Sequence, residues 1–337
     1  MGGISAISTF VSSGVQHART LGLRARIGAT LAHLVHGPHG SVVAHPSLTV
    51  ADAVVAIGRL DVAGGMAGGA KAVAAFDLDG TVFKGNIVPA FARLLAHEGG
   101  FTPVAGAVFD DALRARGVAA AALAPLDANG KARLVLDMME DAPGVAAAVS
   151  DGDFFYLMER ALAGQRRSDL VATAQRLVNH GGGGVPAWHT QVHASGGRSM
   201  ADVVHAARER GLEPIAITLG FDWLAEAAAP LVGIHPSRVF ASQSVVSGGV
   251  LTGATLVQLD KATTLQRVLG GAPMVSFGDS LPDAAMFRMS KLLGFAVNPK
   301  PELLEAIRAA KFPVSVINFE GTMADALRGS GALQAAI

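Results

Sequence analysis

Short apolar runs alternate with longer amphipathic stretches over most of the chain. Short runs of this kind are typical of strands buried on both faces of a parallel sheet. Stretches with apolar positions at helical spacing separate several of these runs. The alternation predicts an α/β fold with a mainly parallel sheet. The predicted strands cover residues 73–76, 214–218, 238–242, 273–277, 293–297 and 314–318.

A long region between the first two predicted strands has helical spacing of its apolar positions and no expected strand. We therefore predict that residues 89–196 form an inserted α-helical cap. Residues 71–88 and 197–337 would together form the core that carries the sheet. The predicted helices of the cap cover residues 90–97, 112–123, 132–139, 154–162 and 170–178.

The first 70 residues are predicted to form a partly helical N-terminal extension. Thr49 precedes an apolar stretch and is expected to cap a helix. The glycine-rich residues 64–71 are expected to be a linker into the first strand. Clustered histidines can bind metal, but here no carboxylate accompanies them, and we interpret their segment as a solvated loop. These are His33, His36, His39 and His45.

Composition restricts the classes of function. The chain has 337 residues, 50 % of them hydrophobic and 16 % charged, which indicates a folded protein of about two domains. Lys plus Arg equals Asp plus Glu at 27 each, so we expect no nucleic acid partner. The absence of cysteine excludes disulfides and thiolate chemistry and is compatible with a cytoplasmic protein. No apolar run reaches the ~18 to 20 residues of a membrane span.

Two carboxylates follow the first predicted strand, at Asp77 and Asp79, with Gly80 and Thr81 after them. Strand alternation would point both side chains the same way. Open α/β sheets bind ligands at the carboxyl ends of their strands. Because two neighbouring anions repel each other, a divalent metal beside them is the simplest expectation. A surface turn rich in Asp and Gly is the alternative.

Two further residues stand where they could bind an anion. Thr218 ends the second predicted strand, and the backbone amides that follow it could hold phosphate or an oxyanion. Lys261 stands in the first turn of a predicted helix, where the helix dipole disfavours a cation unless an anion is near. Taken alone, Thr218 is an ordinary strand threonine, and a surface lysine is the favoured interpretation of Lys261.

A second pair of carboxylates follows the predicted strand at residues 273–277. The sequence there reads Gly-Asp-Ser-Leu-Pro-Asp, with the acids at Asp279 and Asp283. Gly278 permits a close approach of the backbone. Because the carboxyl ends of parallel strands meet at one edge of a sheet, we expect these acids to lie near the first pair.

Taken together, these positions resemble the motifs of the haloacid dehalogenase (HAD) superfamily of aspartate-nucleophile phosphatases. The resemblance covers roughly residues 71–312, and its subgroup is the one that contains phosphoserine phosphatase. It implies a Rossmann-like three-layer core with a helical cap inserted between the first two motifs. The motifs are D-x-D-G-T from Asp77 to Thr81, Thr218, Lys261, and G-D-S-x-x-D from Gly278 to Asp283.

The resemblance also implies a mechanism. Asp77 would attack phosphorus and form an aspartyl phosphate. Asp79 would protonate the leaving alcohol and then activate water. Thr218 and Lys261 would orient the phosphate oxygens and neutralise their charge.

The implied cofactor is Mg²⁺. It would be held by Asp77, the backbone carbonyl of Asp79, and Asp279. Asp283 would position the waters of the metal or the side chain of Lys261. The resemblance thus implies a magnesium-dependent phosphatase that acts on a small phosphorylated metabolite.

The chain departs from phosphoserine phosphatase just after the first motif. That enzyme tends to carry acidic residues there, whereas this chain has Phe83, Lys84 and Asn86. We therefore expect a small phosphomonoester other than phosphoserine, with these residues and Gly220 contacting it. A phosphotransferase or mutase that uses the same aspartyl phosphate is the alternative, as is a catalytically silent HAD-fold binding protein.

Overall fold

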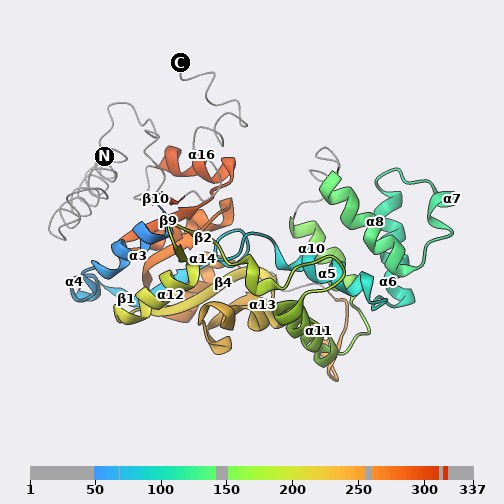
Figure 1. Cartoon of the computed structure of the whole chain (residues 1–337), viewed down its shortest axis with the longest axis horizontal. Coiled ribbons are helices and arrows are strands. Elements are labelled where there is room, and N and C mark those ends of the chain that lie inside the picture. Colours follow the sequence, from blue (N-terminus) through green and yellow to red (C-terminus); the bar gives the residue numbers. More distant parts are fainter. Residues whose placement is uncertain (1–48, 68, 142–150, 255–259, 311–313, 318–337) are drawn as a thin grey trace, which may run out of the picture.

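The computed structural model describes residues 49–67, 69–141, 151–254, 260–310 and 314–317 (Figure 1). Its largest sheet has six strands in the order β10-β9-β8-β1-β4-β5, and every neighbouring pair is parallel. The predicted α/β fold with a mainly parallel sheet is confirmed. The strands are β1 (Ala70–Phe76), β4 (Glu213–Phe221), β5 (Val239–Ser242), β8 (Ala272–Gly278), β9 (Leu293–Val297) and β10 (Val314–Ile317).

The chain winds outward from β1 in two directions. From β1 it reaches β4 and β5 on one side, and it then crosses over to β8, β9 and β10 on the other. This strand order is that of a doubly wound Rossmann-like sheet. In such a sheet the direction in which successive strands are added reverses between the first and the fourth strand, and we call this point the sheet reversal. Here the reversal lies between β1 and β8. A ligand is expected in the crevice at the carboxyl ends of these two strands.

Helices cover both faces of the sheet. Ala74 and Phe76 of β1 belong to a core cluster that includes α3 (Val50–Gly58) and α12 (Met200–Glu209). Val73 and Ala75 alternate with them and pack with α14 (Lys261–Leu269) and α15 (Ala284–Met289) on the other face. Alternation along a strand therefore produces the predicted three-layer arrangement. The remaining core helices are α4 (Val62–Ala67), α13 (Asp222–Ala228) and α16 (Pro301–Ala310).

Three phenylalanines form a stacked row across the middle of the sheet. Phe76 lies opposite Phe277, and Phe277 lies opposite Phe295. Their ring centroids are 4.5 and 4.7 Å apart, with planes 7° and 8° from parallel. Stacked aromatic pairs contribute about 0.5 to 1.5 kcal/mol each beyond their burial. This row aligns β1, β8 and β9, and Asp77 directly follows its first ring.

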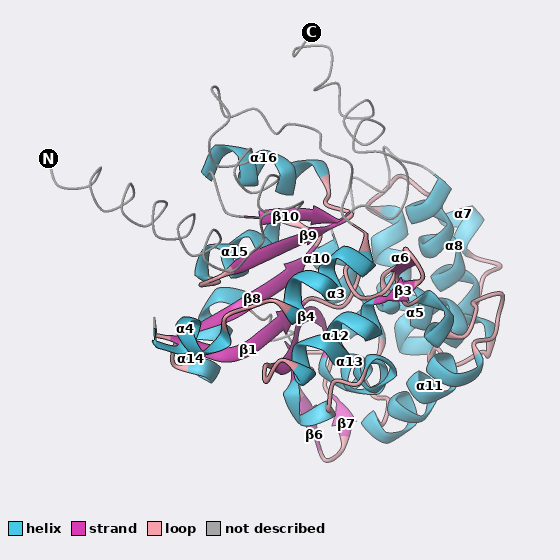
Figure 2. Ribbon diagram, turned by 60° about the vertical axis from the view of Figure 1, so that its left-hand side comes forward, coloured by secondary structure: helices cyan, strands magenta, loops and turns pink. Residues whose placement is uncertain are grey.

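The inserted region is mainly helical, and Figures 1 and 2 both show its helices gathered beyond one end of the sheet. One predicted helix, at residues 112–123, is wrong, because Gly117 has a φ of +84° and interrupts it. A short hairpin of β2 (Ala194–Ser195) and β3 (Arg198–Ser199), which the sequence pattern did not predict, follows the helices. The helices are α5 (Ile87–His97), α6 (Pro103–Arg114), α7 (Ala120–Leu123), α8 (Ala128–Asp141), α10 (Asp151–Ala161) and α11 (Arg167–His180).

The two connections between the insertion and the core lie side by side. Phe83 bridges to Val192 in antiparallel fashion. The N–H of Lys84 donates to the carbonyl of Gln191 at 2.8 Å, and the N–H of His193 donates to the carbonyl of Val82 at 2.9 Å. The insertion therefore leaves and re-enters the core at one place, next to the end of β1. The cap boundaries themselves stay a prediction.

Residues 49–67 pack on the core, although the sequence pattern places them in an extension. The side chain of Thr49 accepts from the N–H of Asp52, and the Asp52 carboxylate accepts from the N–H of Thr49 at 2.8 Å. This reciprocal pair is the predicted cap of α3. The expectation of a linker at residues 64–71 is wrong, because α4 occupies part of this segment and Gly65 lies against Met274. The predicted histidine loop lies outside the described residues.

The second predicted strand is longer than expected. The sequence pattern ends this strand at Thr218, but β4 continues to Phe221, which lies opposite Ser242 of β5 after a shift in register. A small hairpin of β6 (Val246–Ser247) and β7 (Val250–Leu251) follows β5. Within the described residues, none of the helices combines the length and apolar character that crossing a membrane requires.

Candidate active site

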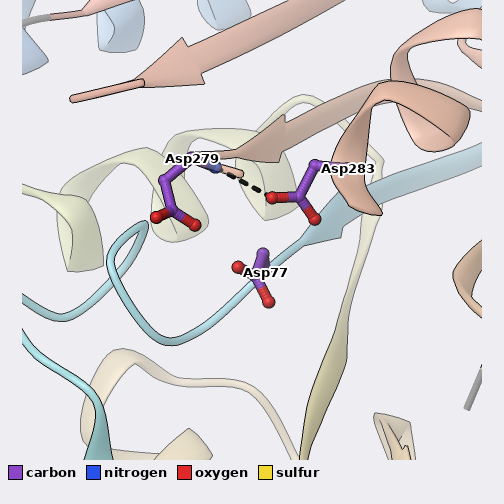
Figure 3. Close-up of side chains that lie close together, drawn as sticks. All are labelled: Asp77, Asp279 and Asp283. Carbon is purple, nitrogen blue, oxygen red and sulfur yellow. Dashed lines mark hydrogen bonds between the residues drawn. The ribbon is translucent and has the colours of Figure 1, made fainter. Parts of the chain in front are cut away.

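Three carboxylates meet at the carboxyl ends of β1 and β8. Figure 3 shows Asp77, Asp279 and Asp283, each of which offers an oxygen within 4.8 Å of the others. Their exposed fractions are only 4 %, 4 % and 0 %. The N–H of Asp77 donates to the carbonyl of Phe277 at 3.0 Å, so the ladder between the two strands continues into the site. The sheet reversal thus brings together acids that are far apart in the sequence.

Lys261 lies among these acids. Its Nζ is 2.6 Å from Oδ1 of Asp77 and 2.5 Å from Oδ1 of Asp283, and its side chain is buried. Burial by itself lowers the pKa of the Lys261 ammonium, but Asp283 and Asp77 outweigh burial and raise that pKa above its ordinary value. Lys261 is therefore a permanent cation. Asp260 caps the helix by accepting from the N–H of Thr263 at 2.6 Å.

Both oxygens of Asp283 are engaged. Oδ1 accepts from Lys261, and Oδ2 accepts from the N–H groups of Asp279 and Ser280 at 2.9 Å each. The Ser280 hydroxyl donates to the same Oδ2 at 3.1 Å. A Cβ on Gly278 would lie 2.3 Å from the Cβ of Asp283, so this close packing requires glycine. These bonds hold Asp283 in place as an anchor for Lys261 and for the loop that carries Asp279.

Two residues of the first motif, Gly80 and Thr81, lie against Asp279. The Thr81 hydroxyl lies 3.4 Å from Oδ2 of Asp77 and 3.4 Å from Oδ1 of Asp279, and it is fully buried. Gly80 has a φ of +75°, and a Cβ there would lie 2.4 Å from Oδ2 of Asp279. The glycine is therefore needed both for the turn and for the approach of Asp279. The sequence indicates the turn, but the approach depends on packing between two distant segments.

Asp79 connects the site to the inserted helices. Its Oδ1 accepts from the N–H of Ile87 at 2.9 Å, at the start of α5. A Cβ placed on Gly220 would lie 3.6 Å from Oδ2 of Asp79 and 3.5 Å from Oγ1 of Thr218, so these oxygens converge there. The Thr218 hydroxyl also accepts from the N–H of Gly220 at 3.1 Å. Of the predicted catalytic residues, Asp77 and Lys261 are in direct contact, whereas Asp79 and Thr218 lie beside Gly220.

The expected substrate contacts have different environments. Phe83 is 1 % exposed, and its ring centroid lies 5.8 Å from that of Trp188. Asn86 caps α5 by accepting from the N–H of Val88 at 3.0 Å. Lys84 is exposed. The structure thus gives Phe83 and Asn86 packing and capping roles, and a contact with substrate stays a prediction for both, as it does for Lys84.

The sequence does not single out Lys300, which also faces the site. Its Nζ lies 3.8 Å from Oδ2 of Asp279, and its N–H donates to the Asp279 carbonyl at 2.8 Å. The residue follows β9, the strand next to β8. Its place after a predicted strand is the signal that could have identified it.

Negative charge exceeds positive charge among the buried groups. Burial and then the charge of Asp283 raise the pKa of Asp77 well above its ordinary value, although Lys261 opposes them. Burial and Asp283 also raise the pKa of Asp279, which Lys300 opposes. An added cation would relieve this repulsion. Clustered carboxylate oxygens are the ligands that Mg²⁺ prefers, so the residues present fit a magnesium ion.

Comparisons with known proteins give fold similarities only. No protein-family profile matches the sequence, and no curated protein matches it. A protein of unknown function from Bordetella pertussis Tohama I is 18 % identical with a TM-score of 0.49, over 73 % of this chain and 98 % of that one. A HAD family hydrolase from Salmonella enterica serovar Typhi is 18 % identical with a TM-score of 0.43, over 70 % and 65 %.

A substrate-bound phosphoserine phosphatase is 13 % identical with a TM-score of 0.43, over 76 % of this chain and 97 % of that one. At these identities and scores, the similarity concerns the path of the chain. The functional proposal below therefore rests on the geometry of the site.

Proposed function

We propose that the protein is a magnesium-dependent phosphatase that hydrolyses a small phosphomonoester through an aspartyl phosphate on Asp77. The observation that carries this proposal is the buried contact of Asp77 with Lys261, beside Asp279 and at the sheet reversal. Oδ1 of Asp77 is on Lys261, and Oδ2, which lies 3.4 Å from the Thr81 hydroxyl, would attack phosphorus. The lysine also supplies positive charge where a phosphate would bind.

In the first step, an oxygen of Asp77 attacks phosphorus and the bond from phosphorus to the ester oxygen breaks. This covalent step divides one difficult displacement into two easier ones. Lys261 neutralises phosphate charge because Asp283 keeps its ammonium beside Asp77. Thr218 would donate its hydroxyl to a phosphate oxygen.

Magnesium would be held by Asp77, Asp279 and the backbone carbonyl of Asp79, and when bound it would supply positive charge to the phosphate oxygens. Asp283 would act through Lys261, since hydrogen bonds already engage both of its oxygens. Of the two roles that the resemblance leaves open for Asp283, these bonds support the positioning of Lys261.

Asp79 would act as the general acid in the first step and as the general base in the second. It would give a proton to the leaving alcohol oxygen in the first step. In the second step it would take a proton from the water that attacks the aspartyl phosphate, which releases phosphate and restores the Asp77 carboxylate. Its hydrogen bond to Ile87 ties this acid to the first inserted helix, so closure of the cap over the site would also orient the proton donor.

The test measures phosphate release from a generic aryl phosphate with Mg²⁺. We expect Asp77→Asn to lower the rate by roughly 10³-fold or more. Asp111→Asn, at an exposed position of α6, is the matched control and should equal the parent. Equal, negligible rates in the parent and Asp77→Asn would instead favour a silent HAD-fold protein.

Mass spectrometry of the intact protein separates hydrolysis from transfer. A phosphatase should accumulate little phosphorylated protein and should turn over in water. A burst of phosphorylation without turnover, relieved by an added alcohol or sugar, would replace the phosphatase proposal with a phosphotransferase.

A further inference from the structure

The turn between α10 and α11 pairs with the small hairpin of β6 and β7, which belongs to the core. The N–H of Gly164 donates to the carbonyl of Leu251 at 2.9 Å. The N–H of Leu251 donates in turn to the carbonyl of Gln165 at 2.9 Å. We call residues 164–167 the strap, because they join the inserted region to the core in addition to the paired segments where the insertion leaves and re-enters it.

The second half of the strap completes the pairing. The N–H of Arg167 donates to the carbonyl of Gly249 at 2.9 Å, and Arg166 is the antiparallel partner of Val250. The strap is therefore a third strand on the hairpin. Nη2 of Arg167 also lies 3.1 Å from Oδ2 of Asp222, at the start of α13, so an ion pair joins the same two parts of the molecule.

Apolar side chains bury the contact between α10 and the core. The ring of Phe155 in α10 meets that of Phe221 at the end of β4, with centroids 6.2 Å apart, and both side chains are buried. A Cβ on Gly253 would lie 2.6 Å from the Cβ of Ala163, so the backbone beyond β7 closely approaches the residue before the strap. Separation of α10 from the core would expose these rings to water, which the hydrophobic effect opposes.

We propose that the strap keeps α10 and α11 on the core throughout the reaction, so that substrate enters and leaves while these two helices stay in place. The physical reason is that the backbone pairing, the ion pair and the ring contact would all have to break together. The inference rests on the proposed phosphatase function, because it concerns access to that site. It also goes beyond that function, since an inserted region joined to the core only where it leaves and re-enters could swing as a whole.

The absence of cysteine from the chain permits a direct test with an engineered disulfide. Arg166 and Val250 face each other between the flanking backbone hydrogen bonds and form none with each other. In such pairs the Cα atoms lie about 4.5 Å apart, within the span of about 4.4 to 6.8 Å that disulfides bridge. The double variant Arg166→Cys/Val250→Cys should therefore form a disulfide on mild oxidation, and the mass of the intact protein measures its formation.

Phosphate release from an aryl phosphate with Mg²⁺ is then compared between the oxidised and the reduced double variant. We expect the two rates to agree within about 2-fold, because turnover does not require the strap to open. A larger loss on oxidation that a reductant reverses would show that the strap opens during turnover and would overturn the inference. Failure of the disulfide to form in the folded variant would contradict the pairing and overturn it as well.

Arg166→Ser/Val250→Ser is the matched control. It removes the same two side chains and cannot form the crosslink, so oxidant and reductant should leave its rate unchanged. Its rate should equal that of the reduced cysteine variant. A rate that changes with oxidant in this control would identify damage elsewhere in the protein, and the loss on crosslinking is measured relative to it.

Amide hydrogen exchange of the parent tests the strap without any variant. Arg166 and Gly249 are exposed, so the N–H groups of Arg167 and Leu251 exchange slowly only if the pairing persists. We expect both to exchange at least about 10²-fold more slowly than in the unfolded chain, with and without Mg²⁺ and inorganic phosphate. Weaker protection would show that the pairing opens readily and would overturn the inference.

Failure of the inference differs from failure of the proposed function. If the parent hydrolyses aryl phosphate and the crosslink stops it, the phosphatase proposal stands and the strap is refuted as a permanent connection. If the parent hydrolyses nothing, the phosphatase proposal fails. The exchange rates of Arg167 and Leu251 then still decide whether the strap stays closed.

Discussion

Nζ of Lys261 lies 2.6 Å from Oδ1 of Asp77, and both side chains are almost fully buried. The same ammonium lies 2.5 Å from Oδ1 of Asp283, so two buried carboxylates share one cation. Loss of one member of a buried ion pair leaves an uncompensated charge, which is much more costly than loss of a surface pair. Lys261 is therefore expected to support both the fold and the chemistry.

Lys261→Met should reduce the free energy of unfolding by about 3 to 5 kcal/mol, because Asp77 and Asp283 would then face each other without a cation. Urea denaturation of the parent and the variant measures this loss. Lys291→Met, at an exposed position, should change the free energy of unfolding by less than about 0.5 kcal/mol. An unfolding free energy for Lys261→Met equal to that of the control would contradict the structure.

Gly80→Ala should impair metal binding, because a Cβ at this position would lie 2.4 Å from Oδ2 of Asp279. Gly99→Ala is the control, since Gly99 has a similar φ of +73° against +75° but no neighbour within 4 Å of its added Cβ. Both variants carry the backbone strain of a left-handed residue, so both should lose roughly 1 kcal/mol of stability or more. Titration with Mg²⁺ should show weakened binding in Gly80→Ala alone.

Replacing Asp79 should separate its chemical role from its structural one. Asp79→Asn keeps an oxygen that accepts from the N–H of Ile87, so its melting temperature should stay close to that of the parent. Phosphate release should fall by roughly 10²-fold or more, since an amide cannot exchange the proton.

Asp79→Ala removes that hydrogen bond as well and should lose about 1 kcal/mol of stability. Thermal unfolding followed by circular dichroism compares the two variants. If Asp79→Asn released phosphate as fast as the parent, another group would have to supply the proton.

Outside the candidate active site, another buried acid, Glu159, lies where the inserted helix α10 meets the core. Oε2 of Glu159 accepts from the hydroxyl of Ser244 at 2.9 Å, and Ser244 accepts from Nε1 of Trp223 at 3.2 Å. Within the described part of the chain, Oε1 of Glu159 has no hydrogen-bond partner. Burial raises the pKa of Glu159 and nearby Asp222 adds to the rise, although bonds from Ser244 and Val245 oppose it.

The raised pKa of Glu159 makes its contribution to stability depend on pH. The folded protein holds this proton more tightly than the unfolded chain does, so the contribution is complete below the ordinary pKa of 4.5. It is lost as pH rises through the raised pKa. Glu159→Gln stays neutral, so it should gain stability relative to the parent as pH rises over this range.

Urea denaturation at a series of pH values measures the difference between Glu159→Gln and the parent. Glu305→Gln, at an exposed position of α16, should follow the parent at every pH. A constant difference between Glu159→Gln and the parent across the series would show that Glu159 does not titrate in this range.

The apolar runs determine much of this architecture because a strand buried on both faces needs a continuous apolar sequence. They place Asp77 and Asp279 at the ends of neighbouring parallel strands, so the meeting of these acids is predictable. The sequence pattern fails where local signals compete. Gly117 interrupts a region with helical spacing, and β4 runs past Thr218 because pairing with β5 outweighs the turn tendency of Gly220.

The sequence by itself determines which groups are available for the chemistry, since carboxylates and a threonine follow apolar strands of one parallel sheet and a lysine begins a predicted helix. Only the tertiary structure decides which oxygen of Asp77 meets Lys261, that Gly80 must make room for Asp279, and that Lys300 lies beside the same carboxylate. These contacts join segments far apart in the chain. Their distances depend on strand register and side-chain packing, which no local pattern of residues encodes.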